Sequence, residues 1–403
     1  MQAYVVIGAC FGDEGKGLTT DYLAAKHTSK SLVVRFNGGA QAGHTVHTKS
    51  GQRHVFKHFG SGSFVGSPTY LSEFFICNPI LFHTELKQLN TLGLHPKVFV
   101  NHSAIITTPY DMMINQIVEE FRNNTKHGSC GVGINETVER NLDPKFAIKL
   151  DMLFEHTVLL EKLLYIQKKW VYPRLRQLGI EQVSNEWRAR LSSIEILEYF
   201  LNEIKFFTEN SIVTDNHILQ KFSTIIFEGA QGLLLDEEKG FFPHVTRSST
   251  GLKNVLAITK DTNITTLEVF YVTRSYLTRH GAGPLPFELN RSPYTNIVDQ
   301  TNVNNLYQGS LRFAWFNLDL LQQAIFADLS EVPKTININV NLLVTCIDQL
   351  DQHVKFVTQA QLLTIPKDKL LEYVQLAFPN FKIWYSNSAT RETIVPLKLS
   401  GCK

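Results

Sequence analysis

Long hydrophobic runs, cysteine motifs, internal repeats and an excess of one charge are all missing from this sequence. No apolar stretch approaches the ~20 residues that a membrane span needs, and the chain begins with the strand-like MQAYVVIGA instead of a signal peptide. The 39 basic and 37 acidic residues leave a formal net charge of only +2, which does not indicate a polyanionic partner. We therefore expect a cytoplasmic protein that binds neither a membrane nor a nucleic acid.

The cysteines are few and scattered. There are five of them, at Cys10, Cys77, Cys130, Cys346 and Cys402. Their number is odd and no two have C-x-x-C spacing, which is typical of reduced thiols in a cytosolic compartment and argues against a disulfide framework or a zinc site.

The composition that remains is that of a globular protein, with 43% hydrophobic and 19% charged residues over 403 positions. Short runs rich in β-branched or aromatic residues recur, each followed by a loop: YVVIGA, SLVVRFNGG, FICNP, KVFVNHS, STIIFEGA, EVFYVTRS and NLLVTCID. Such runs are typical of strands buried in a parallel sheet, whereas residues 145–207 have helical spacing. We expect one P-loop-like α/β domain over residues 1–403, with a mostly parallel central sheet flanked by helices and a helical subdomain inserted at residues 145–220.

The first glycine-rich turn, GACFGDEGKG at residues 8–17, is the most informative segment. Glycines after a strand let backbone N–H groups approach phosphate, and the following helix adds its positive end. The segment differs from the common P-loop, G-x-x-x-x-G-K-[ST], because its first glycine is two residues too far back and Gly17 replaces the hydroxyl residue that holds magnesium. Asp13 stands inside the turn instead. A carboxylate beside phosphate indicates metal binding or proton transfer.

The second glycine-rich segment, NGGAQAGHTV at residues 37–46, also follows a strand-like run and carries His44. A single histidine of this kind is more often a surface or core residue. Beside the Asp13 loop, however, it favours an acid–base pair that acts on one substrate from the ends of two strands.

Four further segments carry candidate site residues. In FEGAQGLLLD, the amide of Gln231 can read a carbonyl and a ring nitrogen, or it can cap a turn. The hydroxyl-rich PHVTRSSTG and the turn TRHGAGP are weak signals alone. Val344-Thr345-Cys346-Ile347-Asp348 ends a late strand with a carboxylate that either reads guanine or caps a helix.

Taken in order, GDEGKG, GGxxAGHT, FEGAQGxLLD and RxGAGPxP resemble the adenylosuccinate synthetase family over residues 4 to about 395. The resemblance implies a ligase that forms a C–N bond. In this family, GTP-dependent phosphorylation of the 6-oxygen of IMP precedes attack by the amino group of L-aspartate. It also implies Mg²⁺ as cofactor and a homodimer, with Arg140 reaching the monophosphate of the other subunit.

The same resemblance assigns the site residue by residue. It makes Asp13, His44 and Gln231 catalytic, and Asp13 with the carbonyl of Gly43 the magnesium contacts. The GTP-binding positions are Gly12, Glu14, Gly15, Lys16, Gly17, Asp348, Ser386 and Ser388. The monophosphate-binding positions are Gln41, Cys130, Arg140, Gln231 and Thr246. The aspartate-binding positions are Gln308, Ser310 and Arg312.

Several positions depart from the family pattern while the proton-transfer pair is kept. The departures are Gln41 for an asparagine, Cys130 for a threonine, Val132 and Ser310 for arginines, His280 for a valine near the ribose and Cys346 for the base-covering lysine. If the chemistry is retained and the pocket is altered, two substrates are compatible with the sequence. One is IMP with GTP; the other is dGMP with ATP or GTP, as in the phage-type 2-aminoadenylosuccinate synthetases. A non-catalytic P-loop-like nucleotide-binding regulator is the alternative of a different class.

Overall fold

The computed structural model describes residues 1–27, 30–122, 130–297 and 310–398. Its centre is a ten-stranded sheet in which all neighbouring strands run parallel except the last two at one edge. In sheet order the strands are β18 (Ile394–Pro396), β17 (Lys382–Ser386), β14 (Asn337–Thr345), β9 (Thr266–Arg274), β1 (Gln2–Gly8), β8 (Thr224–Gly232), β2 (Ser31–Arg35), β5 (Thr69–Leu71), β6 (Val98–Asn101) and β7 (Ile212–Thr214). The expected mostly parallel α/β fold is confirmed.

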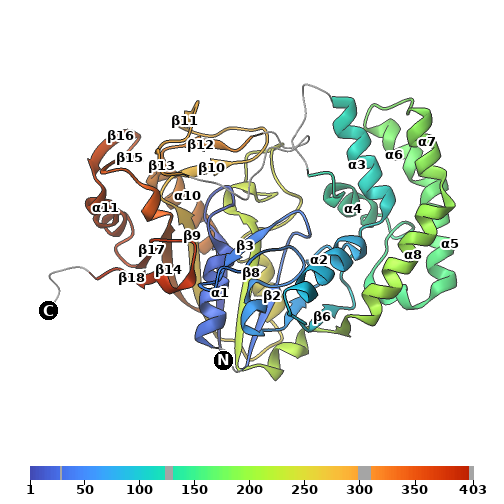
Figure 1. The fold of residues 1–403 in the computed structure, drawn as a ribbon, viewed down its shortest axis with the longest axis horizontal. Coiled ribbons are helices and arrows are strands. Elements are labelled where there is room, and N and C mark those ends of the chain that lie inside the picture. The colour runs from blue at the N-terminus through green and yellow to red at the C-terminus, as the bar shows by residue number, and fades with distance from the viewer. Residues whose placement is uncertain (28–29, 123–129, 298–309, 399–403) are drawn as a thin grey trace.

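Smaller sheets and the helices surround this centre (Figure 1). The smaller sheets are β10 (Leu277–Arg279) with β12 (Arg312–Ala314) and β11 (Glu288–Leu289), β13 (Phe316–Asn317) with β15 (His353–Thr358) and β16 (Gln361–Pro366), and β3 (His44–His47) with β4 (Arg53–Phe56). The helices are α1 (Lys16–Lys26), α2 (Pro79–Thr91), α3 (Pro109–Arg122), α4 (Ile134–Asn141), α5 (His156–Lys169), α6 (Val171–Gln177), α7 (Asn185–Ser192), α8 (Ile194–Glu209), α9 (Lys253–Thr259), α10 (Leu318–Leu329) and α11 (Leu370–Ala377). Within the described residues, none of them is long and apolar enough to span a bilayer.

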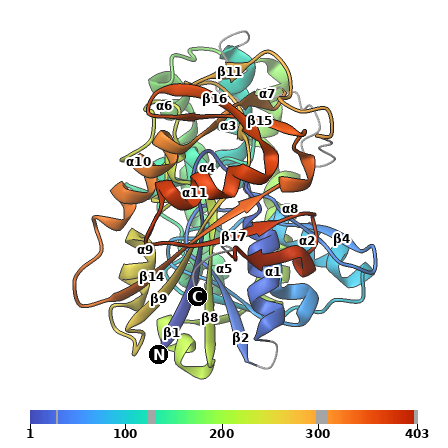
Figure 2. The same cartoon turned by 90° about the vertical axis from the view of Figure 1, so that its left-hand side faces the viewer.

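The central sheet is buried on both faces because side chains of a strand alternate in direction. On β1, Val6 packs with Leu23 of α1 in one apolar cluster. Val5 and Ile7 point the other way, into the main core that holds Val255 of α9. Figure 2 shows the strands side by side with α1 and α9 on opposite sides. This two-sided burial explains why the strands read as continuous apolar runs.

A second apolar core lies beside the β5–β6 side of the sheet, where α2, α3 and α5–α8 meet. Leu163 of α5 and Phe200 of α8 are fully buried in it. Figure 1 shows these helices gathered at one end of the molecule. The same core also holds Leu71 of β5 and Val100 of β6, so it is shared with the central sheet, and a helical subdomain inserted at residues 145–220 stays a prediction.

One predicted strand is wrong. The FICNP run at residues 75–79 forms only isolated bridges, at Ile76 and Cys77, and the strand in this part of the chain is β5. Phe75 and Cys77 are nevertheless fully buried, since they fill the second core from a loop. Their burial produced the apolar signal that resembled a strand.

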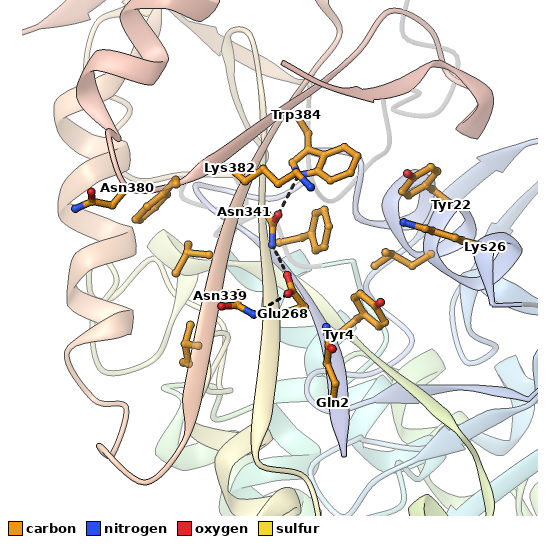
Figure 3. Close-up of a pocket in the computed structure, with 15 residues that line it drawn as sticks. Gln2, Tyr4, Tyr22, Lys26, Glu268, Asn339, Asn341, Asn380, Lys382 and Trp384 are labelled. Carbon is orange, nitrogen blue, oxygen red and sulfur yellow. Dashed lines mark hydrogen bonds between the residues drawn. The ribbon is translucent and has the colours of Figure 1, made fainter. Parts of the chain in front are cut away.

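A cavity of about 650 Å³ opens on the amino-terminal halves of β1, β9, β14 and β17, and Figure 3 shows its lining. Its polar floor is paired internally, because Asn339 and Asn341 donate to Glu268 at 2.8 and 2.9 Å and Trp384 donates to Asn341 at 2.9 Å. None of the predicted site residues lines it. In parallel sheets ligands bind at the carboxyl ends of the strands, so the active site is expected at the opposite edge.

Candidate active site

The glycine-rich turn between β1 and α1 lies at the carboxyl edge of the sheet. Gly12 and Gly15 have φ of +93° and +98°, and Asp13 itself has φ of +56°, in the left-handed region that glycine, asparagine and aspartate tolerate best. The Nε2 of His280 lies 3.0 Å from Oδ2 of Asp13. Burial raises the pKa of Asp13, but the hydrogen bond and charge of His280, with Arg274 and Lys16, lower it to about 2. Asp13 is therefore ionised.

Glu14 faces back into the same turn. Its carboxylate accepts hydrogen bonds from the backbone N–H groups of Cys10 at 2.6 Å and of Gly12 at 3.1 Å. Burial is the largest influence on this group and raises its pKa to about 7, although Lys16 and the two N–H donors oppose the shift. In this arrangement Glu14 supports the turn from inside.

Lys16 and Gly17 open α1, whose N-terminus points at the turn. Lys16 is buried, and burial lowers its pKa. A Cβ atom at Gly17 would lie 3.0 Å from Cβ of His44 and 3.1 Å from the carbonyl oxygen of Thr45. The absence of a side chain at Gly17 thus lets the Asp13 turn and the His44 loop pack directly together.

His44 is held by a buried carboxylate that the sequence did not reveal. Its Nδ1 lies 2.7 Å from Oε1 of Glu228 and 2.9 Å from Nη1 of Arg35. Its Nε2 lies 3.3 Å from the carbonyl oxygen of Ala230. The other carboxylate oxygen of Glu228, Oε2, accepts a hydrogen bond from the backbone N–H of Ser61 at 3.1 Å and lies 3.4 Å from Nη1 of Arg35. Burial raises the pKa of Glu228, but the charges of His44 and Arg35 lower it to about 2. Burial and Arg35 lower the pKa of His44.

The two glutamines of the predicted substrate site lie on adjoining loops. Gln231, at the end of β8, has its side-chain oxygen 3.4 Å from the position of a Cβ on Gly12. Both polar side-chain atoms of Gln41 are buried and have no hydrogen-bond partner within the described part of the chain. Because buried polar groups are almost always satisfied, Gln41 fits a position completed by a ligand.

The predicted base-binding residues lie at the carboxyl ends of β14 and β17. Thr345 ties this edge to the first turn, because its hydroxyl donates to the carbonyl of Glu14 at 2.9 Å. Asp348 is exposed within a short 3-10 helix (Ile347–Gln349) whose N-cap is Cys346, so the helix-cap interpretation of Asp348 is wrong. Ser386 donates to the carbonyl of Ser388 at 2.7 Å.

The remaining monophosphate and aspartate positions are spread more widely. Thr246 is half-buried, and its N–H donates to the carbonyl of Leu235 at 2.8 Å. Burial raises the pKa of Cys130. The guanidinium of Arg312 is paired with Glu288 at 2.5 Å and also donates to the carbonyls of Gly281 and Gly283, each at 2.9 Å. Ser310 is exposed at the edge of the described residues, and Gln308 lies outside them.

Arg140 is packed in the interior of its own chain. Its side chain is fully buried, and its guanidinium contacts both carboxylate oxygens of Asp111, at 2.8 and 2.9 Å. The rest of the guanidinium donates to the carbonyls of Phe146 and Ile106, at 2.6 and 2.7 Å. These contacts give Arg140 a structural role within its own chain, and the contact with a partner's monophosphate stays a prediction.

Replacing Arg140 should therefore affect stability before it affects substrate binding. Arg140→Ala leaves Asp111 buried and unpaired, which costs about 3–5 kcal/mol of unfolding free energy. Denaturant unfolding measures this loss. Lys205→Ala is the matched control, since its 4.0 Å pair with Glu209 is exposed and should change stability by at most ~0.5 kcal/mol. An Arg140→Ala protein of normal stability with a raised KM for the monophosphate would contradict the structural role.

Sequence reasoning missed Glu228, Arg274 and Arg35 and treated His280 only as a departure. Glu228 had a visible signal, since it is a carboxylate at the end of a strand-like run, STIIFE. Arg35 had a similar one within SLVVR. Their partnership depends on the register of β2 and β8, which places Arg35 beside Glu228. That register is a long-range property of the fold.

The fold and the site together define a nucleotide-binding α/β protein of the P-loop-like kind, with an acidic residue inside its phosphate turn and a buried histidine–carboxylate pair beside it. The chain belongs to the adenylosuccinate synthetase family, because residues 5–395 match the model of that family, "Adenylosuccinate synthetase". The expected resemblance is confirmed. The family consists of ligases that form a carbon–nitrogen bond in purine biosynthesis, and this chain is a ligase of that type.

Curated relatives agree with this assignment. The chain is 28% identical over 333 residues to the adenylosuccinate synthetase of Thermoplasma volcanium, covering 82% of this chain and 74% of the relative. It is 30% identical over 294 residues to that of Streptomyces griseus, covering 72% and 66%.

Two solved structures share the fold. The fully ligated adenylosuccinate synthetase of Plasmodium falciparum matches with a TM-score of 0.73 at 16% identity, covering 98% of this chain and 100% of that chain. The cyanophage S-2L succinoaminodeoxyadenylate synthetase, bound to dGMP and dATP as an energy donor, matches with a TM-score of 0.64 at 14% identity, covering 99% and 96%.

Proposed function

We propose that the chain joins L-aspartate to C6 of IMP in a GTP-dependent reaction through a 6-phosphoryl intermediate. Family membership supports the reaction type. The observation that carries the proposal is the packing of two loops: the turn with ionised Asp13 lies against the loop with His44 because Gly17 has no side chain. Those two groups are the ones that the reaction requires.

The proposed first step activates a poor leaving group. The carboxylate of Asp13 takes the N1 proton of the purine, and the electron pair moves to the 6-oxygen, which attacks the γ-phosphorus of GTP and releases GDP. Lys16 and the N-terminus of α1 neutralise charge on the phosphates. His44 is oriented by Glu228 and presents Nε2 to the oxygen that receives the phosphoryl group.

The second step replaces the phosphorylated oxygen by nitrogen. The amino group of L-aspartate attacks C6, the C6–O bond breaks, and phosphate leaves with the bonding electrons and takes up the proton that the amine loses. Arg312 is proposed to bind the aspartate carboxylate, for which it must exchange its ion pair with Glu288. This exchange keeps one carboxylate on the guanidinium throughout, so little electrostatic energy is lost.

The residues present fit Mg²⁺ as the cofactor. Among the described residues there is no group of three or more His, Cys, Asp or Glu that could hold a metal ion by themselves. Mg²⁺ commonly binds through one or two carboxylates together with substrate phosphates, and Asp13 with the carbonyl of Gly43 would supply such a partial set. Bound there, Mg²⁺ would neutralise charge that develops on the transferred phosphoryl group.

We assign each proposed ligand to residues on the loops at the carboxyl edge of the sheet. The purine and its monophosphate would contact Gln41, Gln231, Thr246 and Cys130, and Gln41 supports this with its unsatisfied amide. The GTP base would lie near Asp348, Ser386 and Ser388. We also propose a homodimer. We assign no residue that reaches the partner's site, because Arg140 is buried in its own chain.

A second candidate uses dGMP and ATP or GTP to form the 2-amino product. It is favoured by one observation about this chain: altered positions lie on segments that contact the first turn. His280 contacts Asp13 itself, and Cys346 follows Thr345, whose hydroxyl donates to the carbonyl of Glu14. Gln41 stands three residues before His44, which packs against Gly17. Such a cluster is expected where substrate choice has changed and chemistry has not.

Steady-state assays of aspartate-dependent phosphate release should separate the candidates. IMP, dIMP and dGMP are each tested with GTP and with ATP, and we expect the highest kcat/KM for IMP with GTP. Activity on dGMP alone would establish the second candidate. Tight nucleotide binding without aspartate-dependent phosphate release from any pair would instead identify a non-catalytic regulator.

A further inference from the structure

His280 makes a contact that family membership does not account for. It follows β10 directly, and its Nε2 lies 3.0 Å from Oδ2 of Asp13. At this distance the imidazole N–H donates a hydrogen bond and the carboxylate oxygen accepts it. Both side chains are 28% exposed, which places the contact at the surface of the site and not in the packed core. His280 contacts Oδ2 of Asp13, and Oδ1 is the other oxygen of that carboxylate.

The rest of Asp13 is held by separate means. Its backbone lies in the left-handed region at φ of +56°. Its carbonyl accepts a hydrogen bond from Nε of Arg274. These two features fix the main chain, but neither determines how the carboxylate rotates about its side-chain bonds. The hydrogen bond from His280 supplies that constraint.

The turn that carries His280 is itself rigidly supported. The guanidinium of Arg279 is 4.6 Å from the ring centroid of Phe11 and donates to the carbonyls of His244 and Pro284, at 2.9 and 2.8 Å. Arg312 holds the carbonyls of Gly281 and Gly283 from the other side. A donor fixed by its neighbours is what a precisely placed reacting group requires.

We propose that His280 is a positioning residue for Asp13: its Nε2–H holds Oδ2 and so sets the orientation of the carboxylate that would act on the substrate and hold the metal. The positioning role depends on the proposed ligase function only because that function makes Asp13 a catalytic residue. Carboxylates that act at metal sites are commonly oriented by a second hydrogen-bonding group, and loss of that group typically costs about 10–100-fold in metal affinity or activity.

Three substitutions test the donor. His280→Leu removes the N–H and keeps the bulk, His280→Gln can place an amide N–H where Nε2 lies, and His280→Asn is too short to do so. We expect His280→Leu and His280→Asn to lower kcat by ~10–100-fold with little change in KM for the monophosphate, and His280→Gln to recover most of it. His47→Leu, which alters another half-buried histidine, should leave kcat unchanged.

Binding of Mn²⁺, followed by electron paramagnetic resonance in the presence of GTP, gives a readout that does not need turnover. His280→Leu should weaken Mn²⁺ binding by ~10–100-fold in the normal protein and have no further effect in an Asp13→Asn background. A protein without ligase activity that still shows this dependence would overturn the proposed function and support the positioning role.

Three results would overturn the positioning role. The first is normal kcat and Mn²⁺ affinity in His280→Leu. The second is equal rescue by Gln and Asn, which would mean that the reach of the donor does not matter. The third is a changed preference between IMP and dIMP at unchanged kcat for IMP, which would make His280 a residue that reads the sugar.

Discussion

Asp13→Asn should abolish turnover while leaving nucleotide binding largely intact. The amide cannot accept the N1 proton, and loss of a positioned base typically lowers kcat by ~10²–10⁴-fold. The phosphate cradle remains, because the loop N–H groups and Lys16 are unaffected. Steady-state kinetics and calorimetric titration with the nucleotide measure the two effects separately.

Asparagine is the better replacement because of the backbone. Asp13 has φ of +56°, which asparagine tolerates well, whereas alanine in the left-handed region costs about 1–2 kcal/mol. Asp13→Ala should be equally inactive but somewhat less stable. Near-normal turnover in either variant would mean that another group takes the proton.

His44→Ala should lower kcat by ~10² or more, the usual scale for a positioned proton donor. The structure adds a companion variant, Glu228→Gln, which keeps the shape of the side chain whose Oε1 lies 2.7 Å from Nδ1 but removes its charge. We expect Glu228→Gln to lower kcat by a smaller factor than His44→Ala. The double variant should have the same kcat as His44→Ala alone.

Stability has to be measured beside activity for this pair, since both side chains are buried. In His44→Ala, Glu228 retains its contacts with Arg35 and Ser61, so its charge is not left without a partner. The variant should therefore stay folded under assay conditions, as circular dichroism can verify. A folded His44→Ala protein with kcat within a few-fold of normal would remove His44 from the mechanism.

The sequence predicted those parts of the site that depend on local patterns. A strand-like run followed by glycines locates the turns with Asp13, His44 and Gln231, because burial on both faces and close backbone approach leave visible signatures. The helical spacing of residues 145–207 likewise corresponds to α5–α8. Each of these patterns is contained in a short, continuous stretch of the sequence.

The parts that were missed depend on contacts between distant segments. Arg140 occurs in a polar helical stretch, and only the fold shows that Asp111, twenty-nine positions away, draws it into the interior. His280 lies 3.0 Å from Asp13 only because β9, which lies just before β10 in the chain, pairs with β1. No local pattern contains either pairing.

The carboxylate of Glu14, bonded to the N–H groups of Cys10 and Gly12, has a kinetic consequence for ligand capture. The turn holds its shape through its own side chain, so its conformational entropy is lost during folding and not during nucleotide binding. A preformed cradle does not require a slow rearrangement before phosphate enters. Nucleotide association should consequently be set by diffusion and orientation, with affinity decided by how long the complex lasts.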